Sequence, residues 1–427
     1  MPDPRRPVDL LVGGLAELAT PEGSAPRGGA DLARIRVLER AAVACDAGRI
    51  VAVGPEAELE ARFAPRHRLD GRGGVLVPGF VDAHTHPVFL GTREDEFEKR
   101  IGGATYVEIA RAGGGIASSL RGVRESSKEV LLERLLVRLD RFLELGTTTI
   151  EAKTGYGLTL EDEMKCLEVL DEAQRRHPVD VVPTFLGAHD FPPEFRERKA
   201  DYVALVEGEM LPRVAASGLA RFCDVFTEAH AFDLDASRRI LERAKELGLE
   251  LRMHVDQLTP LGGAELAAEL GARSADHLEH VSERGIQALA AAGVVPVLCP
   301  VVALYLREPQ EAPGRRMVEA GLAPALATDF NPGSCYLQSL PEVLTWAALR
   351  MGFSASEALT AATLNAACSL GLGAEAGSVE PGKAADLVVL DVPGYRHLTY
   401  ELGRNPVQAV VKAGVPVLER PARRYSL

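Results

Sequence analysis

Residues 75–86 read VLVPGFVDAHTH, an apolar run that ends in two histidines separated by one residue. Such a short run of Val, Leu and Phe, with Gly and Pro beside it, predicts a buried β-strand. Seven later segments repeat this form, with helical patterns between them, at residues 147–157, 180–190, 223–232, 249–258, 274–281, 294–304 and 323–333. Buried strands that alternate with helices predict an α/β fold, and eight such units predict a TIM-type (β/α)8 barrel with a parallel sheet.

One helical stretch illustrates the pattern between the strands. Residues 126–146 read SSKEVLLERLLVRLDRFLELG, in which Ser126 and Glu129 form a candidate capping box and Gly146 ends the pattern. The structural alternative is an open, doubly wound sheet, which the sequence disfavours because no G-x-G-x-x-G follows the first strand. The leucines at helical spacing are Leu132, Leu135, Leu136, Leu139 and Leu143.

The two ends of the chain resemble each other and differ from the middle. Short runs with β-branched residues, bounded by Gly, Asp and Pro, occur near the start (VDLLVGG, RIVAVG) and near the end (DLVVLDV, VQAVVKAG). We therefore expect a small composite β domain from residues 1–76 and 377–427. The barrel would then occupy residues 77–376.

Composition narrows the class of protein. The 427 residues are 46% hydrophobic and 26% charged, with a formal net charge of −13. Nucleic acids and anionic membranes require clustered Lys and Arg, so neither is an expected partner. Six scattered cysteines without a C-x-x-C pair, no signal-peptide pattern and no apolar run long enough to cross a bilayer predict a cytoplasmic protein with reduced thiols.

Histidines gather where the predicted strands end. Five of the eight runs deliver histidine although the chain has only ten. In a barrel the carboxyl ends of the strands meet at one face, so these side chains should converge there. His84 and His86 point the same way because side chains alternate along a strand, and His254 and Asp329 are natural completions of a metal site with three to four N and O ligands.

Other polar residues at these ends have competing interpretations. Asp329 is either a ligand or a helix cap. Lys153 is either a bridging lysine of a two-metal site or, as we favour, part of a structural ion pair. Glu228 and His230 are either extra ligands or, as we favour, polar lining. We expect His280 to face solvent or a loop, whereas His277 follows its strand as His254 follows its own.

These residues resemble a known family. PGFVDAHTH, with a later His and a final Asp, is similar to the amidohydrolase superfamily, whose members join a metal-bearing barrel to a small β-sandwich made from both termini. Finer motifs resemble the imidazolonepropionase family within it: residues 85–116, IEAKTGYGL, FLGAHD, MHVDQL, SADHLEH and ATDFNPGS. The resemblance implies metal-dependent hydrolysis of 4-imidazolone-5-propanoate to N-formimidoyl-L-glutamate in histidine degradation, and a homodimer.

The resemblance also implies residue roles. One Zn²⁺ or Fe ion per chain would be held by His84, His86, His254 and Asp329, and His277 would act on the attacking water. Gln257 replaces a Glu found in some relatives, so more of the acid–base chemistry should fall on His277 and Asp329. The absence of a lysine on the fourth strand fits a single metal. The substrate would be lined by Arg93, Tyr106, Tyr156, His189, Gln257, Asn331, Gly333 and Ser334.

An anionic substrate needs a local cation in an acidic protein. Arg93 is the best candidate because a guanidinium binds a carboxylate through two hydrogen bonds. Tyr106 and Tyr156 would donate to the same propionate, while His189 would bind the ring or help to stabilise the oxyanion. The alternative for Arg93 is a surface ion pair with Glu94 or Asp95.

Three other functions compete with this one. The first is another cyclic-amide hydrolase or a deaminase on the same barrel, for which a carboxylate clamp would be unnecessary. The second is a non-catalytic barrel that binds a small molecule, which an intact ligand set opposes. The third is a metal-dependent aldolase, for which the segment VFTEAHAF offers no suitable lysine.

Overall fold

The computed structural model describes residues 4–105, 108–109 and 112–421. Eight parallel strands form one sheet in which their spatial order follows the sequence, as predicted for a (β/α)8 barrel. An isolated parallel bridge joins Thr85 to Phe330 and brings the first strand to the last. The strands are β8 (Phe80–Asp82), β9 (Thr147–Lys153), β10 (Asp180–Ala188), β11 (Phe222–Thr227), β12 (Glu250–Val255), β13 (Ser274–His277), β14 (Val295–Leu298) and β15 (Ala325–Leu326).

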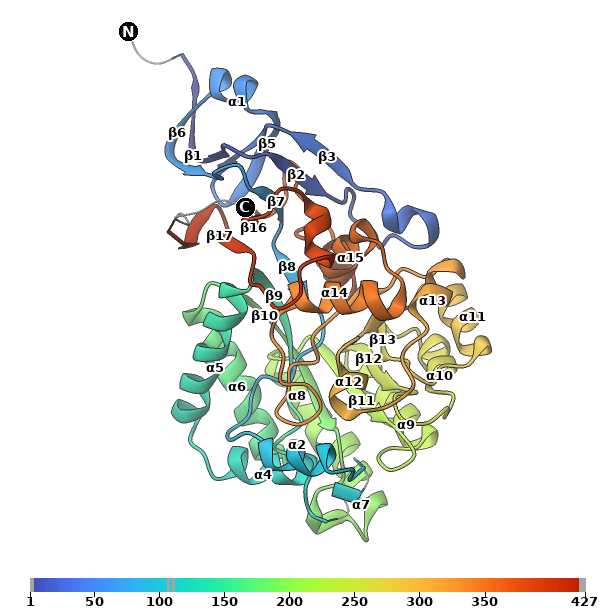
Figure 1. Cartoon of the computed structure of the whole chain (residues 1–427). Coiled ribbons are helices and arrows are strands. Elements are labelled where there is room, and N and C mark those ends of the chain that lie inside the picture. Colours follow the sequence, from blue (N-terminus) through green and yellow to red (C-terminus); the bar gives the residue numbers. More distant parts are fainter. Residues whose placement is uncertain (1–3, 106–107, 110–111, 422–427) are drawn as a thin grey trace.

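Helices cover the outside of this barrel (Figure 1). Those between and after the strands are α5 (Lys128–Glu144), α6 (Leu160–Arg176), α7 (Lys199–Leu205), α8 (Leu211–Ser217), α9 (Leu234–Glu246), α10 (Gly263–Leu270), α11 (Glu283–Ala292), α12 (Val302–Leu306), α13 (Gly314–Glu319), α14 (Leu340–Met351), α15 (Ala355–Thr360) and α16 (Ala366–Ser369). Two more, α2 (Glu94–Ile101) and α4 (Ile116–Arg124), lie in the long connection from β8 to α5.

The sequence of α5 accounts for its packing. Leu132, Leu135, Leu139 and Leu143 are buried at helical spacing, as predicted, so the helix lays one apolar face on the barrel. The predicted capping box is wrong by one residue. Ser127, rather than Ser126, is the N-cap, and its side chain accepts a hydrogen bond from the backbone N–H of Val130.

Strands from both ends of the chain form two further sheets. The four-stranded sheet has the order β5-β4-β1-β6, and the six-stranded sheet has the order β18-β17-β16-β7-β2-β3. These strands are β1 (Arg6–Gly13), β2 (Glu17–Thr20), β3 (Arg36–Glu39), β4 (Ala41–Asp46), β5 (Arg49–Pro55), β6 (Phe63–Asp70), β7 (Val75–Pro78), β16 (Leu387–Leu390), β17 (Val407–Lys412) and β18 (Val415–Glu419).

The six-stranded sheet ties the two ends of the chain together. β7 pairs antiparallel with β16, so that Val77 lies opposite Val388, and Figure 1 shows the blue and red strands side by side above the barrel. Leu10, Leu76 and Leu387 belong to one buried cluster of their own. The division at residues 76–77 and 376–377 stays a prediction, and β7 crosses the first of these limits.

Among the residues that the structure describes, none of the helices combines the length and the apolar character that crossing a membrane requires.

Candidate metal centre and active site

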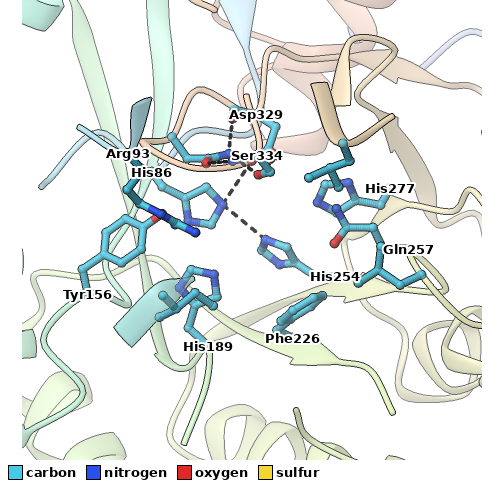
Figure 2. Close-up of a pocket in the computed structure, with 14 residues that line it drawn as sticks. His86, Arg93, Tyr156, His189, Phe226, His254, Gln257, His277, Asp329 and Ser334 are labelled. Carbon is cyan, nitrogen blue, oxygen red and sulfur yellow. Dashed lines mark hydrogen bonds and ion pairs between the residues drawn. The ribbon is translucent and has the colours of Figure 1, made fainter. Parts of the chain in front are cut away.

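The four predicted ligands lie together at the carboxyl end of the barrel, and Figure 2 shows three of them, His86, His254 and Asp329, around one cavity. The Nε2 atom of His86 lies 3.2 Å from that of His84 and 3.4 Å from that of His254. The Oδ1 atom of Asp329 lies 3.5 Å from Nε2 of His84 and 3.3 Å from Nε2 of His86. All four residues are buried. The first strand, the fifth strand and the last strand therefore bring the predicted ligand set to one point.

The spacing of these atoms suits a single metal ion. Four ligands arranged tetrahedrally at about 2.0 Å from one ion lie about 3.3 Å from one another. Four of the six separations among the three Nε2 atoms and Asp329 Oδ1 are close to this value: His84–His86, His86–His254, His84–Asp329 and His86–Asp329 run from 3.2 to 3.5 Å. Three imidazole nitrogens and one carboxylate oxygen also form a donor set that both zinc and iron accept. The residues fit a metal centre.

Two carboxylates, those of Asp276 and Asp224, orient two of the candidate ligand histidines. Nδ1 of His84 donates to Asp276 at 2.7 Å, and Nδ1 of His254 donates to Asp224 at 3.0 Å. Because a neutral imidazole carries one proton, a ring that donates through Nδ1 would offer an unprotonated Nε2 to an ion. Burial and Lys153 lower the pKa of His84, but Asp276 and Asp329 outweigh them and raise it to about 9, so an ion would compete with a proton there. The carboxylates thus fix both the tautomer and the orientation of their histidines.

Lys153 lies among these carboxylates rather than at the metal centre. Its Nζ contacts Glu151 and Asp224 at 2.7 Å and Asp276 at 3.6 Å, and its side chain is completely buried. Burial lowers the pKa of Lys153, but Asp224 and Glu151 outweigh it and hold the pKa above its ordinary value. The alternative, a bridging lysine of a two-metal site, would have to be carbamylated, and carbamylation needs a neutral amine. The structure therefore supports the structural ion pair. Arg252 adds a second buried cation, 3.1 Å from Asp276.

At two strand ends the backbone adopts a left-handed conformation, which residues other than glycine rarely adopt. His277 has a φ of 78° and Asp329 a φ of 51°. A left-handed conformation at such a residue costs roughly 1–3 kcal/mol and persists where surrounding contacts impose it. At Asp329 the N–H donates to the carbonyl of His84 at 3.0 Å, which holds the carboxylate toward the histidines.

His277 belongs to the same cluster. Its ring centroid lies 5.0 Å from that of His84 and 5.3 Å from that of His254. Ligand atoms of these three histidines all lie within 4.8 Å of one another, so they form a second set of candidate donors. His280 is half-buried and is not among the residues that line the cavity; that it faces solvent or a loop stays a prediction.

The cluster opens into a cavity with an empty volume of about 460 Å³, part of it open to solvent. Figure 2 shows Arg93, Tyr156 and His189 on one side of the cavity, with Gln257 and His277 on the opposite side. The lining also includes Asn331 and Ser334 from the predicted set, and four apolar residues that the sequence analysis missed: Ile116, Phe226, Leu258 and Leu306. No periodicity separates these four from ordinary core residues.

The remaining predicted residues are placed differently. Tyr106 lies outside the described residues. Gly333 does not line this cavity but packs against Arg93. Glu228, which we expected as polar lining, instead accepts hydrogen bonds from the backbone N–H groups of Leu258 and Ala229. His230 is also absent from the lining, and its ring lies against Phe226 at 5.4 Å between centroids.

Arg93 forms a buried ion pair, but not with the partner expected for a surface pair. Its Nε donates to Glu96 at 2.9 Å, and both side chains are less than a tenth exposed. Glu94 and Asp95, the partners of the alternative interpretation, are exposed. Arg93 therefore belongs to the wall of the cavity.

His189 has a defined tautomer. Its Nδ1 lies 3.0 Å from the carbonyl oxygen of Gly155, which can only accept, so Nδ1 carries the proton. Burial, together with the charge of His86, lowers the pKa of His189 to about 3. The ring is neutral and presents an unprotonated Nε2, which accepts hydrogen bonds. An oxyanion requires a donor, which Nε2 is not in this tautomer, and the role of His189 stays a prediction.

Comparisons with known proteins agree with this geometry. The sequence pattern of the Amidohydrolase family matches residues 75–417, and that of the imidazolonepropionase-like composite domain of bacteria matches residues 41–64. The chain is 51% identical over 413 residues to the imidazolonepropionase of Symbiobacterium thermophilum, covering 96% of this chain and 97% of the relative. It is 47% identical over 415 residues to that of Geobacillus kaustophilus, covering 96% and 98%.

Solved structures show the same fold at lower identity. An adenosine deaminase from Xanthomonas campestris with bound zinc matches with a TM-score of 0.74 at 23% identity, covering 97% of this chain and 94% of that one. The guanine deaminase of E. coli matches with a TM-score of 0.73 at 18% identity, covering 96% and 100%. At these identities the likeness concerns the fold alone.

Proposed function

The chain belongs to the amidohydrolase family and, within it, to the imidazolonepropionases, and from this membership we propose how its residues hydrolyse 4-imidazolone-5-propanoate. One observation carries the proposal. His84, His86, His254 and Asp329 are buried side by side with their neighbouring ligand atoms 3.2–3.5 Å apart, and His86, His254 and Asp329 line a cavity together with the buried Arg93. Such a cavity suits a small anionic substrate with a hydrolysable amide bond, and the product is N-formimidoyl-L-glutamate.

His84, His86, His254 and Asp329 would hold one Zn²⁺ or Fe ion. When bound, such an ion supplies Lewis-acid chemistry and a more acidic water at neutral pH. The chain's own contribution is to orient two of these ligands: Asp276 holds the His84 ring and Asp224 holds the His254 ring through their Nδ1 atoms.

The propionate would be bound by Arg93 and Tyr156. A guanidinium can form two parallel hydrogen bonds with a carboxylate, and a phenol can add a third. Both side chains line the cavity that the metal cluster opens into. Tyr106, the other tyrosine of the predicted set, would join them. This contact would set the ring carbonyl toward the metal cluster.

Two neutral groups would orient the ring. The Nε2 atom of His189 can accept a hydrogen bond from a ring N–H, since its Nδ1 proton is held by Gly155. Gln257 cannot titrate, but its amide can both donate and accept, and it lies across the cavity. Asn331 and Ser334 lie beside Asp329, and the Ser334 hydroxyl donates to Asp329 Oδ2 at 3.3 Å.

Proton transfer would fall to His277. Its position within the histidine cluster places it to take a proton from the attacking water and to return it to the leaving nitrogen. In the balanced reaction, the water oxygen bonds to the ring carbonyl carbon and the C–N bond breaks. The nitrogen takes a proton, and the ring opens to a carboxylate and a formimidoyl group. Asp329 would share in this transfer.

A deaminase or another cyclic-amide hydrolase is the second candidate, because deaminases adopt the same fold. The test is turnover of 4-imidazolone-5-propanoate, followed as loss of its ultraviolet absorbance, alongside metal analysis of the same preparation. Turnover with about one ion per chain supports the proposal. A metal-loaded protein that leaves the substrate intact but deaminates a purine or a pyrimidine would replace it, whereas inactivity toward all of these would favour a binding protein. A homodimer stays a prediction of the family resemblance, and a cytoplasmic location stays a prediction of the sequence analysis.

A further inference from the structure

Arg93, which lines the cavity, forms an ion pair with Glu96, which does not. Arg93 is the N-cap of α2, and Glu96 lies in the first turn of that helix. The Nε of Arg93 donates to Glu96 Oε2 at 2.9 Å, and its Nη2 lies 2.8 Å from the same oxygen. Arg93 lines the cavity, whereas Glu96 does not. The Glu96 carboxylate thus contacts the Nε and Nη2 edge of the Arg93 guanidinium from outside the cavity.

Glu96 is itself fixed by a different element. Its Oε1 accepts a hydrogen bond from the Ser118 hydroxyl at 2.9 Å, and both of its oxygens lie 3.2 Å from the backbone N of Gly115. Gly115 is the N-cap of α4, where a carboxylate is favoured by the helix dipole. Burial raises the pKa of Glu96, yet Arg93 and Ser118 bring it below its ordinary value, so the group is charged. The position of Arg93 is therefore tied to α4.

The guanidinium also lies against the loop that follows the last strand. A Cβ atom placed on Gly333 would lie only 2.2–2.7 Å from guanidinium atoms of Arg93. Arg100, from the same helix α2, donates to the carbonyl oxygen of Gly333 at 2.7 Å. Gly333 is thus held between two arginines of α2, and only a residue without a side chain leaves room for Arg93.

The same loop reaches the metal cluster. The backbone N of Gly333 donates to Asn331 Oδ1 at 2.8 Å, and the side-chain amide of Asn331 donates to the carbonyl of Asp329 at 2.6 Å. Asp329 is a predicted metal ligand. Contacts therefore run without interruption from Glu96 through Arg93 and Gly333 to Asp329, which fixes how far the guanidinium lies from the metal centre.

We propose that Glu96 is a positioning residue, which holds the Arg93 guanidinium at one place so that the site selects the length of the substrate's carboxylate tail. The inference rests on the proposed function, in which Arg93 binds the propionate. A side chain as flexible as arginine loses its freedom when it binds a ligand, and an arginine that is already immobilised avoids that cost. An arginine held at one distance also disfavours a tail one methylene shorter or longer.

Positioning predicts that loss of Glu96 weakens substrate binding, whereas a simple charge argument predicts that it strengthens binding. Glu96 repels a second carboxylate at the same guanidinium, so its removal should strengthen binding if electrostatics alone decided. The two accounts differ in the sign of the change in KM. They also differ in specificity, because only positioning links Glu96 to tail length.

The test compares Glu96→Gln with Glu98→Gln, a matched change at an exposed residue of the same helix. We would measure kcat, KM and metal content with the propionate substrate and with analogues that carry acetate and butyrate tails. For Glu96→Gln we expect kcat/KM on the propionate to fall on the order of 10²-fold, the scale of a 1 Å misplacement, mainly through KM. Its preference for the propionate tail should weaken, while metal content stays the same. Glu98→Gln should behave as wild type. A lower KM, or an unchanged tail preference, overturns the inference.

Gly333→Ala provides a second, independent variant, because it displaces the guanidinium and keeps both charges. If Glu96→Gln fails to fold, KM and tail preference are measured instead on a folded Gly333→Ala enzyme with full metal content, and these values test the positioning of Arg93. A raised KM with weakened tail preference supports positioning, and wild-type kinetics overturn it. Arg93→Met separates this inference from the proposed function. If Arg93→Met still prefers acid to neutral tails, the substrate contact itself is wrong. If it loses that preference while Glu96→Gln keeps its tail preference, only the role of Glu96 is wrong.

Discussion

Nδ1 of His84 lies 2.7 Å from Oδ2 of Asp276, although 192 positions separate the two residues in the sequence. The hydrogen bond holds the ring with its other nitrogen toward the candidate metal centre. Asp276 is in turn contacted by Lys153 and Arg252. The orientation of this candidate ligand is thus set by protein contacts, and several expectations depend on that arrangement.

The first expectation concerns the ion itself. His86→Ala removes the Nε2 atom that lies between those of His84 and His254, so we expect both bound metal and turnover to fall while the fold persists. Metal analysis, turnover and circular dichroism on one preparation check this. A wild-type enzyme that is stripped of metal by a chelator and keeps full turnover would contradict the metal assignment.

The second expectation concerns Lys153, which is fully buried among Glu151, Asp224 and Asp276. Lys153→Met leaves these carboxylates without that cation, and breaking a buried pair in this way costs ~3–5 kcal/mol of stability. Because Asp224 and Asp276 orient ligand histidines, metal affinity should also fall by ~10–100-fold. Denaturant unfolding and a competition assay with a chelating dye measure the two effects. Lys128→Met, at an exposed pair with Glu168, should change neither.

The third expectation concerns the proton. His277→Asn should keep its metal but lose kcat by ~10²-fold or more, since general acid–base groups contribute on that scale. Steady-state kinetics with metal analysis would show this. His280→Asn is the matched control within the segment DHLEH, and it should leave kcat unchanged. If the control is the damaged enzyme and His277→Asn is not, the acid–base role belongs elsewhere.

The fourth expectation concerns Arg93. Arg93→Met should retain metal, but losing a buried charge-assisted contact to the substrate costs ~2–5 kcal/mol, or roughly 30- to 5,000-fold in kcat/KM. Arg93→Lys should recover only part of this, because an ammonium lacks the planar fork. An analogue with a neutral amide tail should be a poor substrate for wild type and nearly equal for wild type and Arg93→Met. Equal discrimination between acid and amide by both enzymes would remove Arg93 from substrate recognition.

The fifth expectation concerns the thiols. All six cysteines are buried, and burial raises the pKa of Cys45 to about 12 and that of Cys368 to about 11. Because the thiolate is the reactive form and forms only as pH approaches the pKa, native protein near pH 8 should react slowly with a thiol reagent. Six thiols should react once the chain is unfolded in denaturant. Rapid reaction of the folded protein would show that one of these cysteines is accessible.

Local sequence determined the elements and the residue types at their ends. Short apolar runs and helical leucines predicted the eight strands and the helices around them, because burial imposes these periods on the chain. Once the strands are parallel, their carboxyl ends must share one face. That is why the sequence could predict that His84, His86, His254 and Asp329 lie together. The structure places neighbouring ligand atoms of the four 3.2–3.5 Å apart, and that they share one ion stays a prediction.

Contacts between distant segments decided the rest. Period and spacing say which way a side chain points from its strand, but not which atom of another segment meets it. The tertiary structure alone gave Arg93 its partner Glu96 rather than Glu94, and His189 its carbonyl partner and hence an accepting Nε2. It also placed Lys153 among carboxylates instead of at the metal. The physical reason is that hydrogen-bond direction and charge pairing depend on separations of a few ångströms, and barrel closure sets these separations between residues far apart in sequence.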